Sequence, residues 1–425
     1  MPNYYLCIDL KSFYASVECV ERGLNPLTTN LVVADPSRGK GAICLAITPA
    51  MKALGIKNRC RIFDIPKNIS YITAIPQMQK YMETSAKIYK IYLRYFAKDD
   101  IHVYSIDECF IDVTNYLHLY QKTPKELGKM LLGLLVDELG LYATCGIGTN
   151  LFLAKVALDV TAKHSPDFIG FLDEESFKEK IWYHEPITDI WNISTGIARR
   201  LARFGAYNLH DVALLKEEIL YREFGINAEL LIDHANGIET CTMADIKAYK
   251  SKSNSHSNSQ ILFTDYNFED AYTVLKEMID VNVLDLVDKG LVCDSISLAI
   301  AYSKDGRSSA NGLLKLGKFT SSLNELQAYF KKLYYKITDE EQMIRRISIS
   351  FNNLVSEEYA SIDLFTDSLK LVKEQRMQHA IIDLKKRYGK NSVLKGLNYT
   401  EKATQRMRNK LIGGHNAIRE DDQDA

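Results

Sequence analysis

Two adjacent carboxylates, Asp107 and Glu108, separate two short runs of alternating apolar residues. The first run ends at Ile106 and the second begins at Cys109, and the alternation in both predicts two β-strands that meet at the carboxylates. Two neighbouring anions on a largely apolar element repel each other and lose hydration, at a cost on the order of several kcal/mol for each buried ion, unless a cation compensates. The pair therefore indicates a divalent metal site. A solvated turn is the alternative, because adjacent acidic pairs such as Asp137-Glu138 also occur in polar stretches.

The length of the chain, 425 residues, is too great for one hydrophobic core and, at roughly 150 residues per domain, predicts several domains. The net charge of −1 indicates no partner, because a balanced total can hide a basic face beside an acidic site. The eight cysteines include no CxxC pair, which argues against a zinc site or a disulfide framework and favours a reducing compartment. No apolar stretch approaches the ~20 residues of a membrane span. We therefore expect a cytoplasmic protein without a membrane partner.

The amino-terminal segment from Tyr4 to Asp9 is typical of a buried strand that ends in a carboxylate. Phe13 and Tyr14 begin a helical pattern directly afterwards, so Asp9 is expected where a strand turns into a helix. Carboxylates at such turns often bind ligands, and the amide groups of a helix start can bind an anion. Capping of the helix by Asp9 or Ser12 is an equally good interpretation of the position alone.

Residues 31–78 predict a small separate α/β unit with strands at 32–34 and 42–47 and a short helix from Pro49. Its loop at 35–41 lacks the GxxxxGK[ST] spacing of a P-loop. Lys52, Lys57, Arg59 and Arg61 make the unit basic, which indicates either an ordinary solvated face or a surface for phosphates.

A later strand at 142–148 is followed by an apolar helix that begins at Leu151. Gly146 and Gly148 do not form a dinucleotide-binding fingerprint, because leucine occupies the third glycine position, 151. Lys155 lies one turn inside this helix, and a lysine whose amine reaches solvent along an apolar face is its simplest interpretation. The strands with the helices between them predict an α+β sheet whose acidic residues come from two chain segments.

Three segments resemble the signature motifs of the Y-family translesion DNA polymerases, in order and in spacing. They are residues 8–18 (IDLKSFYASVE), 104–112 (YSIDECFID) and 145–155 (CGIGTNLFLAK). The resemblance covers nearly the whole chain and is greatest to the UmuC-like branch of Gram-positive bacteria and their mobile elements. The sequence Gly413-Gly414-His415 also resembles that branch.

The resemblance implies an α+β multidomain protein with the right-hand architecture of polymerases. The implied parts are a catalytic palm at 1–28 and 78–165, small fingers at 29–77, a helical thumb at 166–240 with a degenerate helix-hairpin-helix, a linker at 241–259, an α/β little-finger domain at 260–355 and a C-terminal tail at 356–425. The polar run 250–259 cannot build a core and favours a linker, or else the start of a strand in a DNA groove. The tail has an excess of Lys and Arg, which predicts a helix that lies on DNA or a partner, or a solvated helix.

The resemblance also implies a catalytic site with two Mg²⁺ ions, for which Mn²⁺ can substitute. Asp9, Asp107 and Glu108 would be catalytic and would bind the metal together with the backbone carbonyl of Leu10. Ions about 3.5–4 Å apart promote attack of a primer 3′-hydroxyl on the α-phosphate of a deoxynucleoside triphosphate. The implied nucleotide-binding residues are Ser12, Phe13, Tyr14, Thr48, Lys52 and Lys155.

Three of these residues have specific expectations. Tyr14 matches the steric gate of the family, whose ring excludes a 2′-hydroxyl, and the alternative is a core residue beside Phe13. Lys52 stands where the family usually has arginine, and the exchange loses the two-pronged donor geometry of a guanidinium. Lys155 would meet the triphosphate as a point charge.

The implied partners are primer-template DNA, deoxynucleoside triphosphates, a sliding clamp and an accessory protein. The residues implied to bind DNA in the thumb are Thr195, Gly196, Arg199, Arg200 and Arg203. In the hairpin before them, Asn192 and Ser194 occupy places where glycine is expected. The clamp would be bound by Ile362, Leu364 and Phe365 of a short motif in which Ser361 replaces the customary glutamine.

The implied activity is error-prone translesion DNA synthesis of the SOS type. Two alternatives remain at this point, a palm-type nucleotide cyclase and a clamp-recruited DNA-binding scaffold without catalysis. Regions resembling a thumb and a little finger argue against the cyclase, and retention of all three carboxylates argues against the scaffold.

Overall fold

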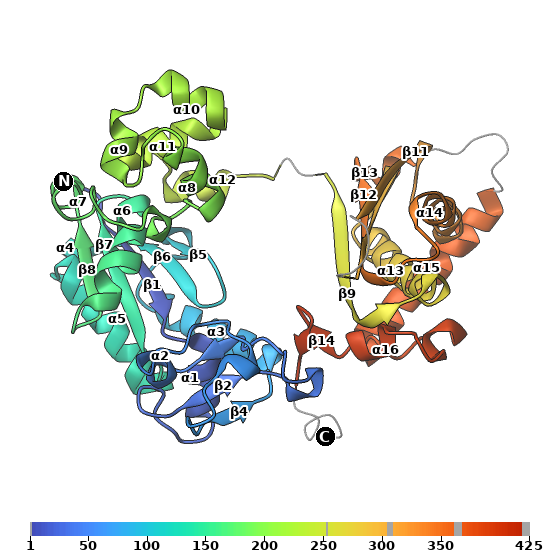
Figure 1. The fold of residues 1–425 in the computed structure, drawn as a ribbon, viewed down its shortest axis with the longest axis horizontal. Helices are drawn as coiled ribbons and strands as arrows, with labels where there is room; N and C mark the ends of the chain where they lie inside the picture. The colour runs from blue at the N-terminus through green and yellow to red at the C-terminus, as the bar shows by residue number, and fades with distance from the viewer. Residues whose placement is uncertain (1, 252–253, 304–308, 361–367, 419–425) are drawn as a thin grey trace. The chain divides into compact units, whose positions relative to one another are not determined.

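The computed structural model describes residues 2–251, 254–303, 309–360 and 368–418, which fold as two compact units. The N-terminal unit comprises residues 1–250 together with 415–425, and the C-terminal unit comprises residues 251–414. Each unit has its own sheet with helices packed on it (Figure 1). The predicted α+β multidomain class is confirmed.

A five-stranded sheet in the order β5-β6-β1-β7-β8 forms the centre of the N-terminal unit. Its neighbours are antiparallel except for the parallel pair β7 and β8. The strands are β1 (Tyr5–Leu10), β5 (Ile101–Val103), β6 (Glu108–Asp112), β7 (Ala143–Gly148) and β8 (Ile169–Leu172). The predicted strands on either side of the carboxylates and at Tyr4–Asp9 are therefore present, but the first ends at Val103 instead of Ile106, and residues 104–107 form the turn before β6.

The two faces of strand β1 have different environments. Leu6 and Ile8 pack into a core with α1 (Phe13–Val20), α3 (Met78–Tyr92) and α5 (Pro124–Leu139). Tyr5 and Cys7 point the other way, against α6 (Leu151–Val156) and α12 (Met243–Ala248). Because side chains alternate along a strand, Asp9 lies on the same face as Tyr5 and Cys7. A short helix, α4 (Tyr116–Tyr120), follows β6.

The glycines of β7 allow α6 to press directly on the sheet. A Cβ atom at Gly146 would lie 2.1 Å from the carbonyl oxygen of Ala154, and one at Gly148 would lie 2.1 Å from its amide nitrogen. No side chain fits such distances, so both positions require glycine. These glycines serve helix-sheet packing, which places Lys155 under the sheet.

The small basic unit contains a three-stranded sheet in the order β3-β2-β4. Its elements are β2 (Leu31–Val33), β3 (Ala46–Ile47), β4 (Ile72–Ala74) and α2 (Pro49–Ala53). The strand predicted at 42–47 is wrong in its first half. Residues 42–45 form no strand. They contain one isolated bridge, between Ile43 and Arg61, which the backbone hydrogen bonds from Cys44 to Cys60 and from Ile62 to Ala42 enclose.

Five short helices form the thumb-like part of the N-terminal unit around a core that includes Phe177, Leu201 and Leu220. They are α7 (Glu174–Lys180), α8 (Thr195–Ala202), α9 (Leu209–Leu214), α10 (Glu217–Phe224) and α11 (Asn227–Ala235). Asn192 has a φ of 68°, the left-handed conformation for which glycine is favoured. Ser194 caps α8 by accepting a hydrogen bond from the amide of Ile197. The turn before α8 thus adopts a conformation that glycine favours and gains a helix cap, although neither position is glycine.

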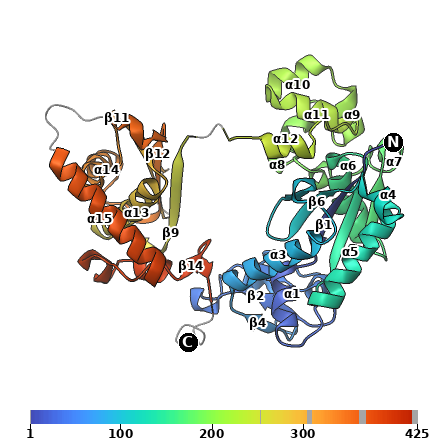
Figure 2. The same ribbon diagram turned by 180° about the vertical axis from the view of Figure 1, so that it is seen from behind.

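The C-terminal unit contains an antiparallel sheet in the order β11-β10-β12-β9, with helices on one face (Figure 2). The strands are β9 (His256–Tyr266), β10 (Leu291–Tyr302), β11 (Ala310–Thr320) and β12 (Ile344–Asn352), with β13 (Val355–Ser356) beside β10. The helices are α13 (Phe268–Asp288), α14 (Leu323–Ile337), α15 (Ser368–Tyr388) and α16 (Gln405–Arg408). The predicted α/β character of this region is confirmed.

Two predicted boundaries of this region are wrong. The linker predicted at 241–259 contains helix α12, which packs on the central sheet through Met243, and β9 already begins at His256. The tail predicted at 356–425 is in large part a packed layer of the C-terminal unit. Helix α15 lies against α13, with Ile382 in the common core. The sequence did not predict this packing, because only a few residues, such as Ile382, are buried in a helix that is otherwise rich in charged side chains.

The two-residue turn between β14 (Leu411–Ile412) and β15 (His415–Asn416) explains the GGH sequence. Gly413 and Gly414 have φ values of 58° and 82°, and a tight hairpin loop of this kind favours glycine at both positions. Beyond it, the carbonyl of Ala417 accepts a hydrogen bond of 3.0 Å from the amide of Gln79. The end of the described chain therefore contacts the start of α3.

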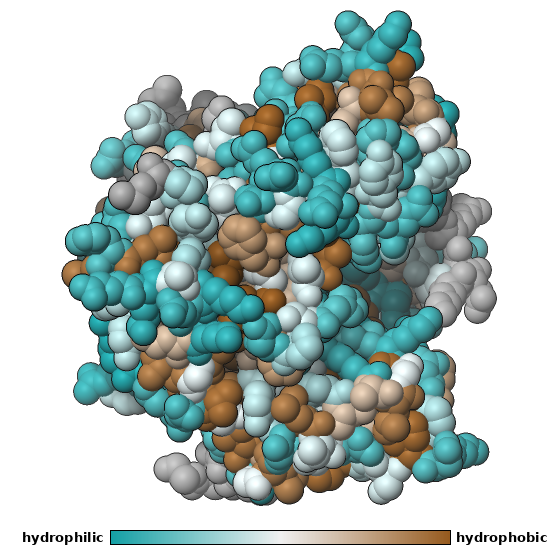
Figure 3. Space-filling model, turned by 90° about the vertical axis from the view of Figure 1, so that its left-hand side faces the viewer, coloured by the Kyte–Doolittle hydropathy of each residue, from teal (hydrophilic) through white to brown (hydrophobic). Residues whose placement is uncertain are grey.

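No helix among the described residues is long and apolar enough to cross a membrane. On the face drawn in Figure 3, hydrophobic residues are interspersed with hydrophilic ones. Exposed apolar side chains of this kind are normal on folded proteins.

Candidate active site

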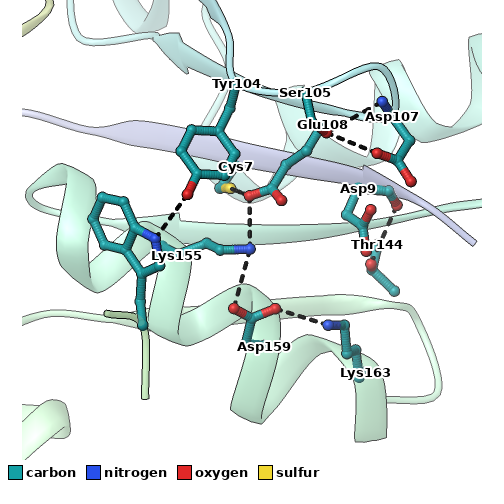
Figure 4. Close-up of polar contacts among 11 residues, drawn as sticks. Cys7, Asp9, Tyr104, Ser105, Asp107, Glu108, Thr144, Lys155, Asp159 and Lys163 are labelled. Carbon is teal, nitrogen blue, oxygen red and sulfur yellow. Dashed lines mark hydrogen bonds and ion pairs between the residues drawn. The ribbon is translucent and has the colours of Figure 1, made fainter. Parts of the chain in front are cut away.

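The predicted metal ligands come together at the end of strands β1 and β6. Asp9 lies directly opposite Glu108 in the antiparallel pair, on the same face of the sheet. Asp107 precedes Glu108 in the turn, and its carbonyl accepts a hydrogen bond of 3.0 Å from the amide of Leu10. Ser105 donates to the carboxylate of Asp107 at 2.7 Å. Figure 4 shows Asp9, Asp107 and Glu108 arranged around this corner of the sheet.

The electrostatics of the corner are unfavourable to free carboxylates. Burial and, after it, the nearby charge of Asp107 raise the pKa of Asp9 from 3.8 to about 7, although Lys163 opposes the shift. Near neutral pH, Asp9 is therefore partly protonated unless another positive charge approaches. A bound cation would restore the carboxylate form.

The carboxylate of Glu108 pairs with Lys155 of helix α6. Lys155 is only 7% exposed, and its Nζ lies 2.7 Å from Glu108 Oε1 and 3.1 Å from Asp159 Oδ2. The thiol of Cys7 donates to the same Glu108 oxygen at 3.2 Å, and burial raises the pKa of this thiol. Glu108 is thus paired with Lys155, and the described residues contain no group of three or more His, Cys, Asp or Glu side chains already arranged to hold a metal ion.

Lys11, Lys52 and Lys163, which come from three segments, lie near Asp9. Of these side chains, only Lys52 was predicted from the sequence as part of the site. Loss of hydration lowers the pKa of Lys11 and of Lys52, the repulsion between these amines lowers it further for Lys11, and Asp9 opposes both shifts. Lys163 acts on both amines and pairs with Asp159 at 2.7 Å. The spacing of Lys163 four residues after Asp159 is a signal that the sequence offered.

Ser12 has two unusual features. Its backbone is left-handed, with a φ of 52°, and it precedes the first residue of α1. Its Oγ is buried and, within the described part of the chain, has no hydrogen-bond partner. An orphaned hydroxyl at a helix start is suited to an anionic ligand. Helix capping by Ser12, the alternative suggested by the sequence, is absent.

Tyr14 is backed by a second aromatic ring. Tyr81 is fully buried and stacks on Tyr14, with ring centroids 4.5 Å apart and planes inclined by 16°. The Tyr81 hydroxyl donates to buried Glu18 at 2.7 Å, which fixes the ring. Burial raises the pKa of Tyr14, and Asp107 adds to the shift, which places Tyr14 near the carboxylates.

Two predicted nucleotide-binding side chains lie in cores. Thr48 is fully buried, and its Oγ1 accepts a hydrogen bond from the amide of Leu31 at 3.2 Å. Phe13 is buried among the residues that pack under β1. The structure therefore does not support contact of either side chain with a nucleotide.

The hairpin residues predicted to bind DNA differ in availability. Thr195, Gly196 and Arg199 are exposed, and Arg199 has no ion pair among the described residues. Arg200 pairs with Glu223 at 2.7 Å and lies over the ring of Phe224, and Arg203 also pairs with Glu223. The clamp-binding residues Ile362, Leu364 and Phe365 lie outside the described residues.

Family models match two parts of the chain. Residues 8–159 match the impB/mucB/samB family, and residues 251–364 match the C-terminal domain of the same family. The second match begins at the boundary between the two units.

Curated relatives and a solved structure match most of the chain. The chain is 32% identical to UvrX of Bacillus subtilis (strain 168) over 419 residues, covering 96% of this chain and 97% of UvrX. It is 27% identical to DNA polymerase IV 2 of the same organism, with the same coverage. The solved Y-family DNA polymerase chimera Dbh-Dpo4(243-245)-Dbh superposes with a TM-score of 0.64 at 19% identity, covering 83% of this chain and 99% of the chimera. The chain therefore belongs to the impB/mucB/samB family and has the fold of a Y-family DNA polymerase.

Proposed function

We propose that this protein is a template-directed DNA polymerase that extends a primer past damaged bases by two-metal nucleotidyl transfer, with error-prone synthesis of the SOS type. The observation that carries the proposal is the meeting of Asp9, Asp107 and Glu108 beside three lysines. Relatives named DNA polymerase IV support polymerase activity, and the name of UvrX, which refers to UV-damage repair, supports a role at lesions.

The donor set fits divalent magnesium, with Mn²⁺ as a substitute. Mg²⁺ prefers oxygen ligands and retains waters, so Asp9, Asp107, Glu108 and the carbonyl of Leu10 suffice to hold two ions. When bound, such ions supply activation of the 3′-hydroxyl and stabilisation of the leaving pyrophosphate. The raised pKa of Asp9 supports a cation at this place, since a bound metal ion would favour the charged form of its buried carboxylate.

Lys155 has a different role in this proposal from the one expected from the sequence. Burial lowers the pKa of its amine, but Cys7, Asp159 and Glu108 raise it more, so the amine stays charged. Its contact with Glu108 holds that side chain at the edge of the site. We assign Lys155 to orienting Glu108, and Glu108 exchanges or shares this partner when metal binds.

The triphosphate is assigned to the residues around the start of α1. Lys11, Lys52 and Lys163 provide positive charge on three chain segments, and Ser12 provides a buried hydroxyl without a partner among the described residues. Tyr14, fixed by Tyr81, lies under the sugar and excludes a 2′-hydroxyl. The site is thereby selective for deoxynucleotides.

Primer-template DNA is proposed to contact the hairpin through the amides at Thr195 and Gly196 and the side chain of Arg199. Arg200 and Arg203 contribute less, because both pair with Glu223, which offsets one of their two charges. Recruitment by a sliding clamp through Ile362, Leu364 and Phe365 is part of the proposal, and alanine at Leu364 and Phe365 should weaken clamp binding in a titration. Equal clamp affinity of the variant would contradict this assignment.

Primer extension tests the whole proposal. The purified protein, with Mg²⁺ or Mn²⁺, should add deoxynucleotides to a primer opposite an undamaged template and opposite an abasic site. Absence of incorporation on both templates with both metals would overturn it. Conversion of a nucleoside triphosphate to a cyclic product without DNA would instead identify the cyclase alternative.

A further inference from the structure

A hydrogen bond joins the thumb-like hairpin to the turn that carries the carboxylates. The indole Nε1 of Trp191 donates to the hydroxyl of Tyr104 at 3.1 Å. The two rings meet edge to face, with centroids 6.0 Å apart and planes at 75°. Trp191 comes from the segment before α8 and Tyr104 from the turn between β5 and β6, 87 residues earlier. The contact therefore connects two distant chain segments within the N-terminal unit.

Tyr104 belongs to the turn that determines where Asp107 and Glu108 lie. Its amide and that of Ser105 both donate to the carbonyl of Glu108, at 3.0 and 3.1 Å. Its ring packs edge to face on Phe110, and Lys155 Nζ lies 5.9 Å from the ring centre. Figure 4 shows Tyr104 beside Glu108 and Lys155. A displacement of Tyr104 thus moves the backbone to which both carboxylates are attached.

The turn itself is weakly buried. Val103 and Tyr104 are 49% and 46% exposed, so little core packing fixes them. The hydrogen bond from Trp191 therefore adds to the few contacts that hold the Tyr104 side chain.

Trp191 contacts the turn through Tyr104, and its neighbour in sequence, Asn192, begins the hairpin. Its ring stacks with His234, which stacks in turn on Phe152 of α6 at 3.9 Å. His234 is buried and bonds to Glu239 at 3.0 Å. The next residue, Asn192, has the left-handed backbone that starts the hairpin. A change in the backbone at Asn192 would therefore act directly on Trp191.

We infer that Tyr104 is a positioning residue, which couples the seating of the hairpin on DNA to the placement of Asp107 and Glu108 through its hydrogen bond with Trp191. The inference rests on the proposed polymerase function. It predicts that loss of this one bond weakens metal use without weakening the grip on DNA. Tyr104→Phe and Trp191→Phe each remove the bond and retain a ring, so the edge-to-face packing and the fold are kept.

The first experiment measures primer extension as a function of Mg²⁺ concentration, together with DNA affinity. Each variant should raise the Mg²⁺ concentration for half-maximal rate about three- to tenfold, as loss of one hydrogen bond does, and leave the Kd for primer-template within twofold. The double variant should be no worse than either single one, because both remove the same interaction. Additive effects, or an unchanged Mg²⁺ requirement in both variants, would overturn the inference. An inactive wild-type protein would instead refute the proposed function.

The second experiment does not depend on activity. The chain has two tryptophans, so Trp182→Phe leaves Trp191 as the only indole fluorophore. Trp182 donates to the carbonyl of Ala235 and does not share the Tyr104 bond, so this variant should retain the wild-type Mg²⁺ requirement. In this background Mg²⁺ should change the emission of Trp191, and Tyr104→Phe should shift that titration to higher Mg²⁺ by the same factor. A titration that Tyr104→Phe does not move would overturn the inference.

Discussion

Two buried carboxylate sites, one in each unit, differ in how their charges are satisfied. In the C-terminal unit Glu277 is 1% exposed and accepts hydrogen bonds from the amides of Thr404 and Gln405 and from the side chain of Asn398, at 2.7, 3.1 and 2.8 Å. In the N-terminal unit Glu108 faces one lysine and one thiol, with Asp9 opposite and Asp107 adjacent.

The difference separates a structural carboxylate from a reactive one. Neutral donors from two segments surround Glu277, so it joins the C-terminal segment to α13 and has no capacity left for a ligand. The carboxylate of Asp9, in contrast, has no hydrogen-bond donor or ion-pair partner among the described residues, and burial and Asp107 raise its pKa to about 7. Incomplete satisfaction is the property that a metal site requires.

The largest expected effect is loss of catalysis at the reactive site. Asp107→Ala and Glu108→Ala should each lower nucleotide incorporation at least about a thousandfold, because a metal ligand is lost at the reacting phosphate. DNA affinity and the thermal unfolding temperature should change little. Primer extension beside a DNA-binding titration measures both. Extension at the wild-type rate by both variants would eliminate the two-metal assignment.

The matched change at the structural site should alter stability and leave chemistry intact. Glu277→Ala removes the acceptor of four donors, of which Asn398 Nδ2, Thr404 N and Thr404 Oγ1 are buried. At about 1–3 kcal/mol for each buried donor, we expect the C-terminal unit to lose at least about 3 kcal/mol of unfolding free energy. Urea unfolding followed together with proteolysis at 395–409 measures the loss. Nucleotide incorporation on short templates, assayed where the variant is folded, should stay within twofold of wild type. A catalytic defect comparable to that of Glu108→Ala would erase the distinction between the two sites.

The pH dependence of stability tests the electrostatic half of the comparison. Without metal, Asp9 has a folded pKa of about 7 against an ordinary value of 3.8, so the folded protein binds more protons than the unfolded chain between these pH values. Its unfolding free energy therefore falls as the pH rises from about 4 to about 7, by up to about 4 kcal/mol at 1.4 kcal/mol per pKa unit. Asp9→Asn should lack this fall, and Mg²⁺ should reduce it in the wild type. Identical pH profiles of the two metal-free proteins would contradict the expectation.

The smallest expected effect concerns sugar selection beside the reactive site. Tyr14→Ala should retain deoxynucleotide incorporation and gain ribonucleotide incorporation about tenfold or more, equivalent to about 1.4 kcal/mol of lost discrimination. Tyr14→Phe keeps the ring on Tyr81 and should leave the ratio unchanged. The measurement is the ratio of kcat/KM values for matched ribo- and deoxynucleotides. A folded, active Tyr14→Ala variant with the wild-type ratio would assign the exclusion to another residue.

Much of the candidate site was accessible from the sequence because its signals are local. Period-two alternation placed Asp9 and the Asp107-Glu108 pair at the ends of strands, and the pairing of β1 with β6 then put Asp9 and Glu108 on one face. Gly146 and Gly148 were seen to precede a helix, which packs closely on the sheet. Periodicity did not predict packing where a helix buries only a few residues. Helix α15 and residues 395–409 are rich in charge, and the few buried groups that dock them, such as Ile382 and Gln378, are not distinguishable from surface residues by periodicity.

The sequence by itself determined that three carboxylates occur at strand ends and that an aromatic residue follows Asp9 at helical spacing, since adjacency and periodicity are properties of short segments. Only the tertiary structure decided which groups surround them. Lys155 turned out to hold Glu108, Lys11, Lys52 and Lys163 gather around Asp9 from three segments, and Thr48 is enclosed in a core. These partnerships join residues far apart in the chain, and their geometry follows from how α6 and the small basic unit pack against the sheet.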